Sequence, residues 1–363
     1  MSHIAIDARI ISSTTGRYVE RLLHYLEKID TTNTYTILVK KKDQQYYTPT
    51  NKNFSVVVAD YKNYSFNEQI GFLRLLNRLN ADLVHFCQPE QPVLYRGKKV
   101  TTIHDLTLLK TYNPDKNWLV YHFKQLVGKF VFKRVIATSE YIITPTDFTK
   151  KEILERFAVS SDKIIRTYLA AEMKSTAQEP FELPSRRFIL CVGQQSEYKN
   201  IKRLAAAHQQ LLSTHPDLLL VLVGKIDGPA QKNQRLFELK RYKHIIFTGF
   251  VSDQQLNWFF SHTSAYIFPS LMEGFGLPGL EAMQQSAPVV SSNATCLPEV
   301  YGDAAVYFNP LDVDDIASTI DTVLSNKSVA DTLVANGSKQ LKKYSWQRTA
   351  QQTHDIYLRA LNK

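Results

Sequence analysis

The sequence alternates between short apolar runs rich in β-branched residues and longer segments with the 3.6-residue period of amphipathic helices. In the first 150 residues, the predicted strands lie at 4–6, 35–39, 55–58, 83–86, 99–103 and 141–144. Residues 17–28 are the clearest helix, with apolar side chains on one side at Val19, Leu22, Leu23 and Leu26. Such alternation predicts a mostly parallel sheet that is covered by helices on both faces.

The same pattern starts again near residue 188. Its predicted strands lie at 188–192, 218–223, 245–247, 265–268, 288–291 and 305–307, with a helix at 202–213. Between the two series, residues 170–187 contain two prolines and no clear period, which predicts an interdomain linker. We therefore expect an α/β fold with two Rossmann-like, doubly wound domains that face each other across a cleft. The expected domains are 1–175, on the acceptor side, and 176–345, which binds the ligand. For a terminal helix at 346–363 the sequence leaves open whether it packs back on the first domain.

Charge is distributed unevenly along the chain. The net charge is +10, and residues 1–180 contribute +8 of it, with 26 Lys and Arg against 18 Asp and Glu. Residues 181–363 contribute +2, with 18 against 16. An excess of cations in one half predicts a negatively charged partner, such as nucleic acid, an anionic membrane surface or a pyrophosphate-bearing acceptor. Because no nucleic-acid-binding motif is recognisable, we expect no nucleic acid.

Several features favour a cytoplasmic location. No apolar run approaches the roughly 20 residues of a membrane-spanning helix, and residues 1–7 carry no secretion signal. Cys87, Cys191 and Cys296 are isolated and lack metal-ligand spacing, which indicates reduced thiols. Residues 116–134 interleave aromatic and basic side chains. They fit either an interfacial helix at the inner face of the membrane or an ordinary surface helix with an apolar inner face.

The most specific segment is the glycine-rich run from Glu273 to Glu281, which follows a strand that ends near Phe268. Its glycines let backbone N–H groups approach a ligand, and Pro278 suits the first turn of a helix, whose N-terminus favours an anion. The two carboxylates can accept hydrogen bonds from sugar hydroxyls. The run therefore predicts a cradle for a phosphorylated sugar, although a glycine-rich turn with two surface glutamates fits the same residues.

Residues 269–283 resemble the Glu-x7-Glu signature of glycosyltransferase family 4, whose fold is GT-B. Further matches follow the family's order at residues 15–18, 102–105, 192–200, 249–252, 292–300 and 302–305. The resemblance implies a retaining, metal-independent hexosyltransferase that uses a nucleoside diphosphate sugar as donor. It implies no cofactor.

The resemblance also assigns roles to residues. Lys199 would stabilise the diphosphate, Glu273 would face the transferred sugar, and His104 would lie near the reacting centre. The donor-binding residues would be Gly16, Phe250, Val251, Gly274, Phe275, Gly276, Leu277 and Glu281. For His104 a buried histidine bonded to backbone is the alternative, and Asp105 is expected to cap its loop.

Two departures from the family pattern stand out. Gln194 replaces the arginine that many relatives carry after Gly193, and Arg203 or another basic residue would have to substitute. The loop before Gly16 has Thr14 and Thr15 where a second glycine is often found. The motif Asp312-Val-Asp314 mimics the metal site of another glycosyltransferase fold, but its acidic residues read as the start of a helix. We therefore expect no metal.

The expected reaction is transfer of a hexose to a glycan or lipid-diphosphate-linked acceptor. The sequence around Gln194 looks similar to mannosyltransferases of polysaccharide assembly, which use GDP-mannose. A UDP-sugar such as UDP-glucose is the rival donor. A catalytically silent scaffold that binds sugar nucleotides is the alternative of another class, although a silent protein has no chemical need for Lys199, both glutamates and His104. A glycosyl phosphorylase is disfavoured because no lysine-cofactor motif is recognisable.

Overall fold

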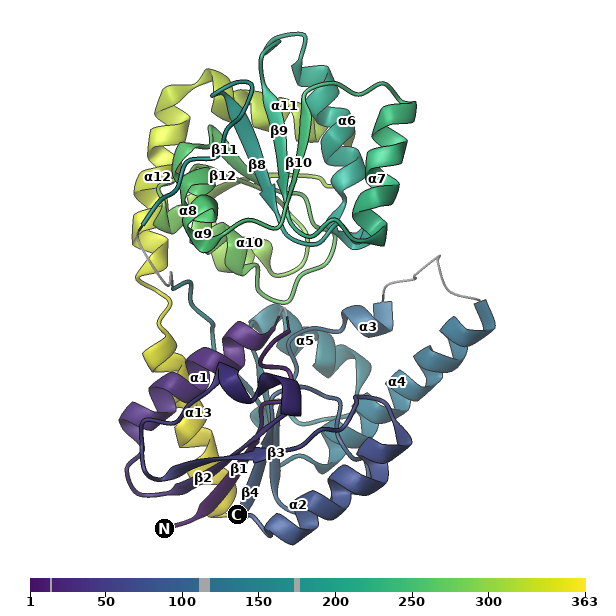
Figure 1. Cartoon of the computed structure of the whole chain (residues 1–363), viewed down its shortest axis with the longest axis vertical. Coiled ribbons are helices and arrows are strands. Elements are labelled where there is room, and N and C mark those ends of the chain that lie inside the picture. Colours follow the sequence, from purple (N-terminus) through teal and green to yellow (C-terminus); the bar gives the residue numbers. More distant parts are fainter. Residues whose placement is uncertain (14, 111–117, 173–176) are drawn as a thin grey trace. The chain divides into compact units, whose positions relative to one another are not determined.

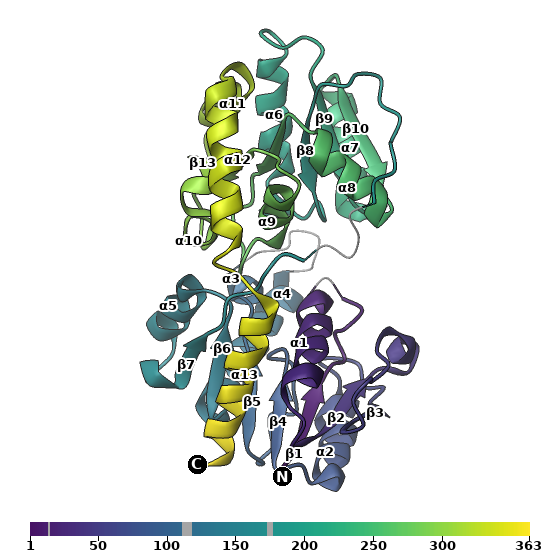
Figure 2. The same cartoon turned by 90° about the vertical axis from the view of Figure 1, so that its left-hand side faces the viewer.

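The computed structural model describes residues 1–13, 15–110, 118–172 and 177–363, with only the backbone in 118–124. The chain forms two compact units. Unit 1 contains residues 1–169 and 345–363, and unit 2 contains residues 170–344 (Figures 1 and 2). Each unit is an α/β layer structure built on a parallel sheet, as the sequence predicts.

Unit 1 is built on a seven-stranded parallel sheet in the order β3-β2-β1-β4-β5-β6-β7. The strands are β1 (His3–Asp7), β2 (Thr34–Val39), β3 (Phe54–Val58), β4 (Leu83–Phe86), β5 (Lys99–Thr102), β6 (Tyr141–Thr144) and β7 (Ile164–Arg166). The helices are α1 (Gly16–Ile29), α2 (Leu73–Leu79), α3 (Thr107–Lys110), α4 (Trp118–Thr138), α5 (Asp147–Arg156) and α13 (Trp346–Leu361), with short helical segments η1 (Lys41–Tyr46), η2 (Glu68–Phe72) and η3 (Ser161–Lys163). Helices α1 and α13 cover one face of the sheet, and α2 and α4 cover the other (Figures 1 and 2).

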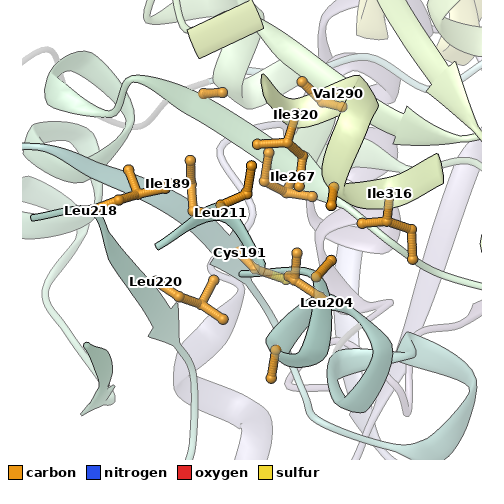
Figure 3. Packing of buried hydrophobic residues seen from close by; sticks show 14 of the residues in the cluster. Ile189, Cys191, Leu204, Leu211, Leu218, Leu220, Ile267, Val290, Ile316 and Ile320 are labelled. Carbon is orange, nitrogen blue, oxygen red and sulfur yellow. The ribbon is translucent and has the colours of Figure 1, made fainter. Parts of the chain in front are cut away.

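Unit 2 is built on a six-stranded parallel sheet in the order β10-β9-β8-β11-β12-β13. The strands are β8 (Phe188–Val192), β9 (Leu219–Val223), β10 (Ile245–Gly249), β11 (Ala265–Phe268), β12 (Val289–Ser292) and β13 (Ala305–Phe308). The helices are α6 (Ile201–Leu211), α7 (Gly228–Leu239), α8 (Asp253–His262), α9 (Leu277–Gln284), α10 (Leu297–Tyr301), α11 (Val313–Ser325) and α12 (Lys327–Leu341), with η4 (Glu197–Lys199) and η5 (Gly302–Ala304). Apolar side chains of the central strands pack against α6 and α11, and Ile189, Leu204, Ile267 and Ile316 lie at the centre of this core (Figure 3).

The predicted strands are present, but one strand and one linker differ from expectation. Strand β7 was not predicted, because three residues after a short helical segment are too few to show a period. Residues 177–187 are not a free linker, since they pack on α8. Asn257 Nδ2 donates to the carbonyl of Ala177 at 3.0 Å, and the rings of Phe181 and Phe259 lie 5.0 Å apart. The chain passes between the units at 169/170 and 344/345, whereas the predicted boundaries were 175/176 and 345/346.

The terminal helix α13 belongs to unit 1. Thr349 Oγ1 donates to the carbonyl of Tyr168 at 2.5 Å, and His354 Nε2 lies 2.9 Å from Asp30 Oδ2. Helix α13 therefore contacts residues near both ends of the segment 1–169. The three cysteines are buried and unpaired. Among the residues that the structure describes, we find no helix with the length and apolar character needed to span a bilayer.

Candidate functional site

An ion pair between Lys199 and Glu273 lies at the carboxyl edge of the sheet in unit 2. Lys199 follows β8, and Glu273 follows β11, so two neighbouring parallel strands bring them together across 74 residues. Lys199 Nζ lies 2.5 Å from Glu273 Oε1, and the two side chains are 18% and 13% exposed. The carboxyl edge of a parallel sheet is where ligands bind in doubly wound folds, so the pair occupies the expected position for a ligand contact.

Lys199 keeps its proton despite its surroundings. Burial alone would lower its pKa, but the charge of Glu273 and the hydrogen bond to it outweigh burial, so the pKa of Lys199 is raised. The rings of Tyr198 and Phe268 each have their centre 5.4 Å from Nζ. The ammonium of Lys199 is therefore a positive charge that is in place before a ligand binds and that a phosphate group can contact.

The glycine-rich turn is shaped by Tyr301, which was not singled out from the sequence. Tyr301 Oη donates to the carbonyl of Gly276 at 2.6 Å. A Cβ at Gly276 would lie 2.6 Å from Tyr301 Oη, and a Cβ at Gly279 would lie 2.3 Å from the same hydroxyl oxygen. Gly276 also has a φ of +90°, a conformation that side-chain-bearing residues rarely adopt. The glycines are therefore required by the tyrosine behind them as well as by any ligand in front.

The remaining residues of the turn are held from behind in the same way. Phe275 is buried, and its ring lies edge-on to Tyr344 with centres 5.6 Å apart. The N–H of Glu273 donates to Thr295 Oγ1 at 3.2 Å, and Cys296 Sγ donates to the carbonyl of Glu273 at 3.3 Å. Helix α9 starts after Gly276, and Glu281 lies in its second turn, partly exposed. The turn thus offers backbone and carboxylates rather than apolar side chains.

The loop after β8 completes this edge of unit 2. A small hollow is lined by residues that include Gly193, Gln194, Lys199, Phe268 and Ser270. Gln194 itself is exposed. Arg203, the suggested substitute for the missing arginine, donates from NH1 to Asn200 Oδ1 at 3.0 Å.

Phe250 and Val251, which follow β10, differ sharply in exposure. Phe250 is 89% exposed, whereas Val251 is 8% exposed. The ring of Phe250 is therefore free of apolar cover and available for a flat partner, while Val251 is a core residue.

Gly16 and His104 belong to unit 1. A Cβ at Gly16 would lie 1.9 Å from the carbonyl oxygen of Ile11, so only glycine fits at the start of α1. His104 Nε2 donates to the carbonyl of Cys87 at 3.0 Å. In a neutral imidazole this leaves Nδ1 as the acceptor. Burial lowers the pKa of His104, opposed by the Cys87 carbonyl and by the charge of Asp105.

Two further assignments from the sequence, one in each unit, are confirmed. Asp105 Oδ1 accepts a hydrogen bond from the N–H of Thr107 at 2.7 Å, which makes Asp105 a loop-capping residue. Asp312 is the N-cap of α11 and accepts from the N–H groups of Asp314 and Asp315 at 3.0 and 3.2 Å. Within the described part of the chain, no group of three or more His, Cys, Asp or Glu could hold a metal ion.

A buried chain of hydrogen bonds runs from the vicinity of His104 to α13. The ring of Tyr18 lies edge-on to His104 with centres 4.9 Å apart, and its Oη lies 2.9 Å from Thr102 Oγ1. Thr102 Oγ1 lies 2.8 Å from His85 Nε2, and His85 Nδ1 lies 2.5 Å from Tyr357 Oη. Burial, and then the nearby His104, lowers the pKa of His85 to about 3, so this imidazole is neutral at physiological pH.

Tyr357→Phe should destabilise unit 1. The substitution removes the 2.5 Å hydrogen bond of the buried His85 Nδ1 and leaves it the long contact with Cys87 Sγ at 4.0 Å, which costs about 1–3 kcal/mol. We expect a lower midpoint in urea unfolding, measured by circular dichroism. Tyr46→Phe is the matched control, because Tyr46 is 57% exposed in the same unit and should leave the midpoint unchanged. An unaltered midpoint in Tyr357→Phe would show that the contact contributes nothing.

Comparisons with known proteins agree with this geometry. The family model described as "Glycosyl transferases group 1" matches residues 174–340. The O-antigen chain mannosyltransferase B of Escherichia coli is 32% identical over 273 residues, which are 72% of this chain and 70% of that protein. The chain belongs to the group 1 glycosyltransferases. As a glycosyltransferase it has, in Lys199 and the turn after Glu273, groups suited to a nucleoside diphosphate sugar.

A second relative and a solved structure match different shares of their own chains. The serotype-specific mannosyltransferase WbdA of Escherichia coli is 30% identical over 279 residues. These are 73% of this glycosyltransferase but 34% of WbdA, so the chain spans about a third of that relative. The structure of sucrose-phosphate synthase from Thermosynechococcus elongatus superimposes with a TM-score of 0.79, covering 99% of both chains at 17% identity. At this identity the likeness shows the fold alone, which is the GT-B fold predicted from the sequence.

Proposed function

We propose that this glycosyltransferase transfers mannose from GDP-mannose to a glycan or lipid-linked acceptor with retention of the anomeric configuration. The observation that carries the proposal is the 32% identity to an O-antigen chain mannosyltransferase over 70% of that protein. The Lys199–Glu273 pair supports it, because both groups suit a phosphorylated sugar.

Lys199 is the main electrostatic group of the proposed reaction. Its ammonium would stabilise the negative charge that develops on the departing diphosphate, together with the amides of Gly274, Phe275, Gly276 and Leu277. The departing phosphate oxygen would itself take the proton of the acceptor hydroxyl on the same face of the sugar. No metal is needed in this scheme, because Lys199 supplies the positive charge.

The carboxylates recognise the rest of the donor. Glu281 would accept hydrogen bonds from the ribose hydroxyls, and Glu273 from those of the mannose. Glu273 is bound to Lys199 in the structure, so donor binding would place the diphosphate on Lys199 and free Glu273 for the sugar. The exposed ring of Phe250 would lie against the base, beside Val251.

Gly16 and His104 have proposed roles within unit 1. Gly16 would let the start of α1 approach a diphosphate, as helix N-termini do with anions. Burial keeps His104 neutral, and its Nδ1 would accept a hydrogen bond from a sugar or acceptor hydroxyl rather than carry a charge.

A panel of nucleoside diphosphate sugars tests the proposal. GDP-mannose should raise the melting temperature most, and incubation with an oligomannoside acceptor should give an α-linked product by NMR. Turnover should persist in EDTA. A larger shift and turnover with UDP-glucose would replace the donor assignment. A shift without turnover for any acceptor would favour the scaffold over the enzyme, and a β-linked product would contradict retention.

We also propose a peripheral contact with anionic membrane through α4, at the cytoplasmic face. Leu126, Val127 and Phe130 are 67%, 38% and 60% exposed and share the helix with the exposed Lys129 and Lys133. A cavity of about 540 Å³ beside them combines cations with apolar walls and is lined by Leu109, Lys129, Lys133, Ile136, Ala137, Arg156, Phe157 and Ala158. Residues 116–117 and the side chains of 118–124, part of the expected interfacial segment, lie outside the described residues.

Reversing two charges on α4 should weaken membrane binding. Each cation near an anionic surface contributes about 1 kcal/mol, so Lys129→Glu/Lys133→Glu should weaken binding at least about 30-fold. Flotation with phosphatidylglycerol liposomes measures this, and binding should fall with added salt. Lys41→Glu/Lys42→Glu, also exposed in unit 1, is the matched control. Equal loss in both variants would show that the net charge acts, and not α4.

A further inference from the structure

The segment between β3 and η2, residues 59–67, presents aromatic side chains to solvent. Tyr64 is 51% exposed and Phe66 is 88% exposed. Tyr64 has a φ of +59°, a conformation that costs a tyrosine free energy. Its N–H donates to Glu68 Oε2 at 2.8 Å, which helps to hold it there. The fold thus fixes an exposed ring in place rather than leaving it to a free loop.

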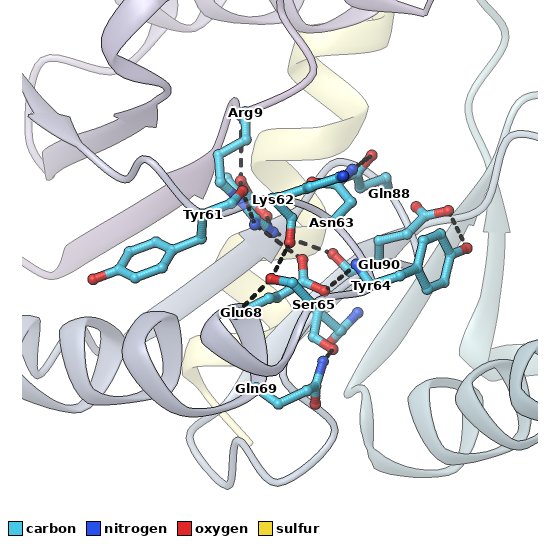
Figure 4. A network of polar contacts seen from close by, with 12 residues as sticks. Arg9, Tyr61, Lys62, Asn63, Tyr64, Ser65, Glu68, Gln69, Gln88 and Glu90 are labelled. Atoms are coloured by element: carbon cyan, nitrogen blue, oxygen red, sulfur yellow. Dashed lines mark hydrogen bonds and ion pairs between the residues drawn. The ribbon is translucent and has the colours of Figure 1, made fainter.

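An ionic network lies beneath this segment and immobilises it. Arg9 is 1% exposed, and it donates to both carboxylate oxygens of Asp7 at 2.8 Å and to Glu68 Oε1 at 2.9 Å. Arg9 also donates to the carbonyls of Tyr61 at 3.2 Å and Glu90 at 3.3 Å. One buried guanidinium therefore joins the loops that follow β1, β3 and β4 (Figure 4).

Polar groups beside Tyr64 remain without partners. Gln88 is 7% exposed, and its Oε1 accepts from Asn63 Nδ2 at 3.3 Å. Among the described residues, Gln88 Nε2 and Asn63 Oδ1 have no hydrogen-bond partner. Buried amides are normally satisfied, so the open donor of Gln88 and the open acceptor of Asn63 call for a hydrogen-bonding ligand. A hydroxyl group, which both donates and accepts, satisfies such a pair.

The charge of this region selects against anions. The carboxylates of Asp7 and Glu68 bind the guanidinium of Arg9, whose contact with Glu90 is to the backbone carbonyl, so the carboxylate of Glu90 adds a further negative charge. Tyr64 Oη donates to Glu90 Oε1 at 2.5 Å, and the two side chains lie together at one side of the network (Figure 4). A diphosphate would meet net negative charge here, whereas a neutral molecule rich in hydroxyls would meet acceptors and an aromatic face.

Gln88 connects this region to His104 within unit 1. His104 donates to the carbonyl of Cys87, and Gln88 is the residue after Cys87. Cys87 and Gln88 follow β4 and His104 follows β5, at the carboxyl edge of the sheet, where doubly wound folds bind their ligands.

We propose that Asn63, Tyr64, Phe66, Gln88 and Glu90 form an acceptor shelf that binds the terminal sugar of a neutral glycan. The inference rests on the proposed function for the word acceptor, but binding itself requires no donor. The Tyr64 and Phe66 rings cover the apolar face of the sugar, and Gln88, Asn63 and Glu90 bond its hydroxyls. The lipid or phosphate end of a longer acceptor lies elsewhere.

Saturation-transfer NMR on the full chain tests the shelf without a nucleotide sugar. The probes are the neutral disaccharides mannobiose, cellobiose and galactobiose, and inorganic pyrophosphate is the anionic competitor. At least one disaccharide should bind, and Tyr64→Ala should weaken it about tenfold, the loss of one aromatic contact. Gln88→Glu, which keeps the shape but replaces the open donor, should weaken it too. Pyrophosphate should not displace the sugar.

A matched variant separates the shelf from other surfaces. Tyr46→Ala removes a similarly exposed tyrosine of unit 1 and should leave binding unchanged. The shelf is refuted if no disaccharide binds, if Tyr64→Ala and Gln88→Glu bind normally, or if pyrophosphate competes. Sugar binding that depends on Tyr64 without any glycosyl transfer would uphold the shelf and contradict the proposed function.

Discussion

Lys199→Ala is expected to lower kcat by about 100- to 1,000-fold while the protein stays folded. The ammonium of Lys199 is fixed before any ligand arrives, because Glu273 raises its pKa against the effect of burial. A charge that is already in place stabilises the departing diphosphate without reorganisation, and alanine cannot replace it. Steady-state kinetics with GDP-mannose measure the loss.

Lys202→Ala is the matched control for that substitution. Lys202 lies three residues further along and also forms an ion pair, with Glu197 at 2.6 Å, but both side chains are about half exposed. An exposed pair contributes little, so this variant should retain nearly normal kcat. Near-normal turnover in Lys199→Ala would remove Lys199 from the mechanism, and an equal loss in both variants would indicate a general effect of charge.

Glu273→Gln should make activity sensitive to alkaline pH. With glutamine, burial acts on Lys199 without the opposing charge of Glu273, so the pKa of Lys199 should fall and its ammonium should lose its proton at a lower pH than in the parent protein. In the parent protein the pKa of Lys199 lies above its ordinary value of 10.5. The kcat of the variant should therefore decline with pH well below 10.5, while that of the parent shows no such decline from Lys199. A pH–rate profile checks this.

The unfolding free energies of the parent and of Glu273→Gln should change in opposite directions as the pH rises. A raised folded-state pKa means that the pair stabilises the parent fully below pH 10.5 and less as the pH rises through the folded-state value. The variant carries an uncompensated partly buried charge at neutral pH and should lose up to about 3 kcal/mol there. The difference in unfolding free energy should shrink towards alkaline pH, when Lys199 is neutral. Glu197→Gln, at the exposed pair, should show neither effect, and parallel pH profiles for Glu273→Gln and the parent would contradict the coupling.

The strands were predictable because each buried parallel strand is a continuous apolar run. Residues 219–223 and 265–268 are such runs, and Gly224 and Pro269 follow their ends. The turn from Glu273 to Glu281 was readable for a similar reason, since its glycines, proline and carboxylates are contiguous. Strand β7 was missed because three residues carry no period.

Long-range partners were not readable from the sequence. Nothing in the spacing of Lys199 and Glu273 indicates that they pair, and only the family resemblance drew attention to Lys199. Tyr301 supports the glycine-rich turn through packing that no motif encodes. Arg9 would ordinarily be assigned to the surface, because arginine is seldom buried. Its network depends on Glu68 and Glu90, which lie 59 and 81 positions further along the chain.

The contact of α13 with the rest of unit 1 has a consequence for how the chain folds. His85 and Tyr357 are 272 residues apart, and all of unit 2 lies between them. During synthesis from the N-terminus, residues 1–169 emerge with α1 but without α13, the second of the two helices that cover one face of their sheet. Unit 2 is continuous from 170 to 344, so it can complete its core while the first sheet still waits for α13. The half of the chain that is made first is therefore the half that finishes last, and its exposed sheet face is the surface that a chaperone would have to protect.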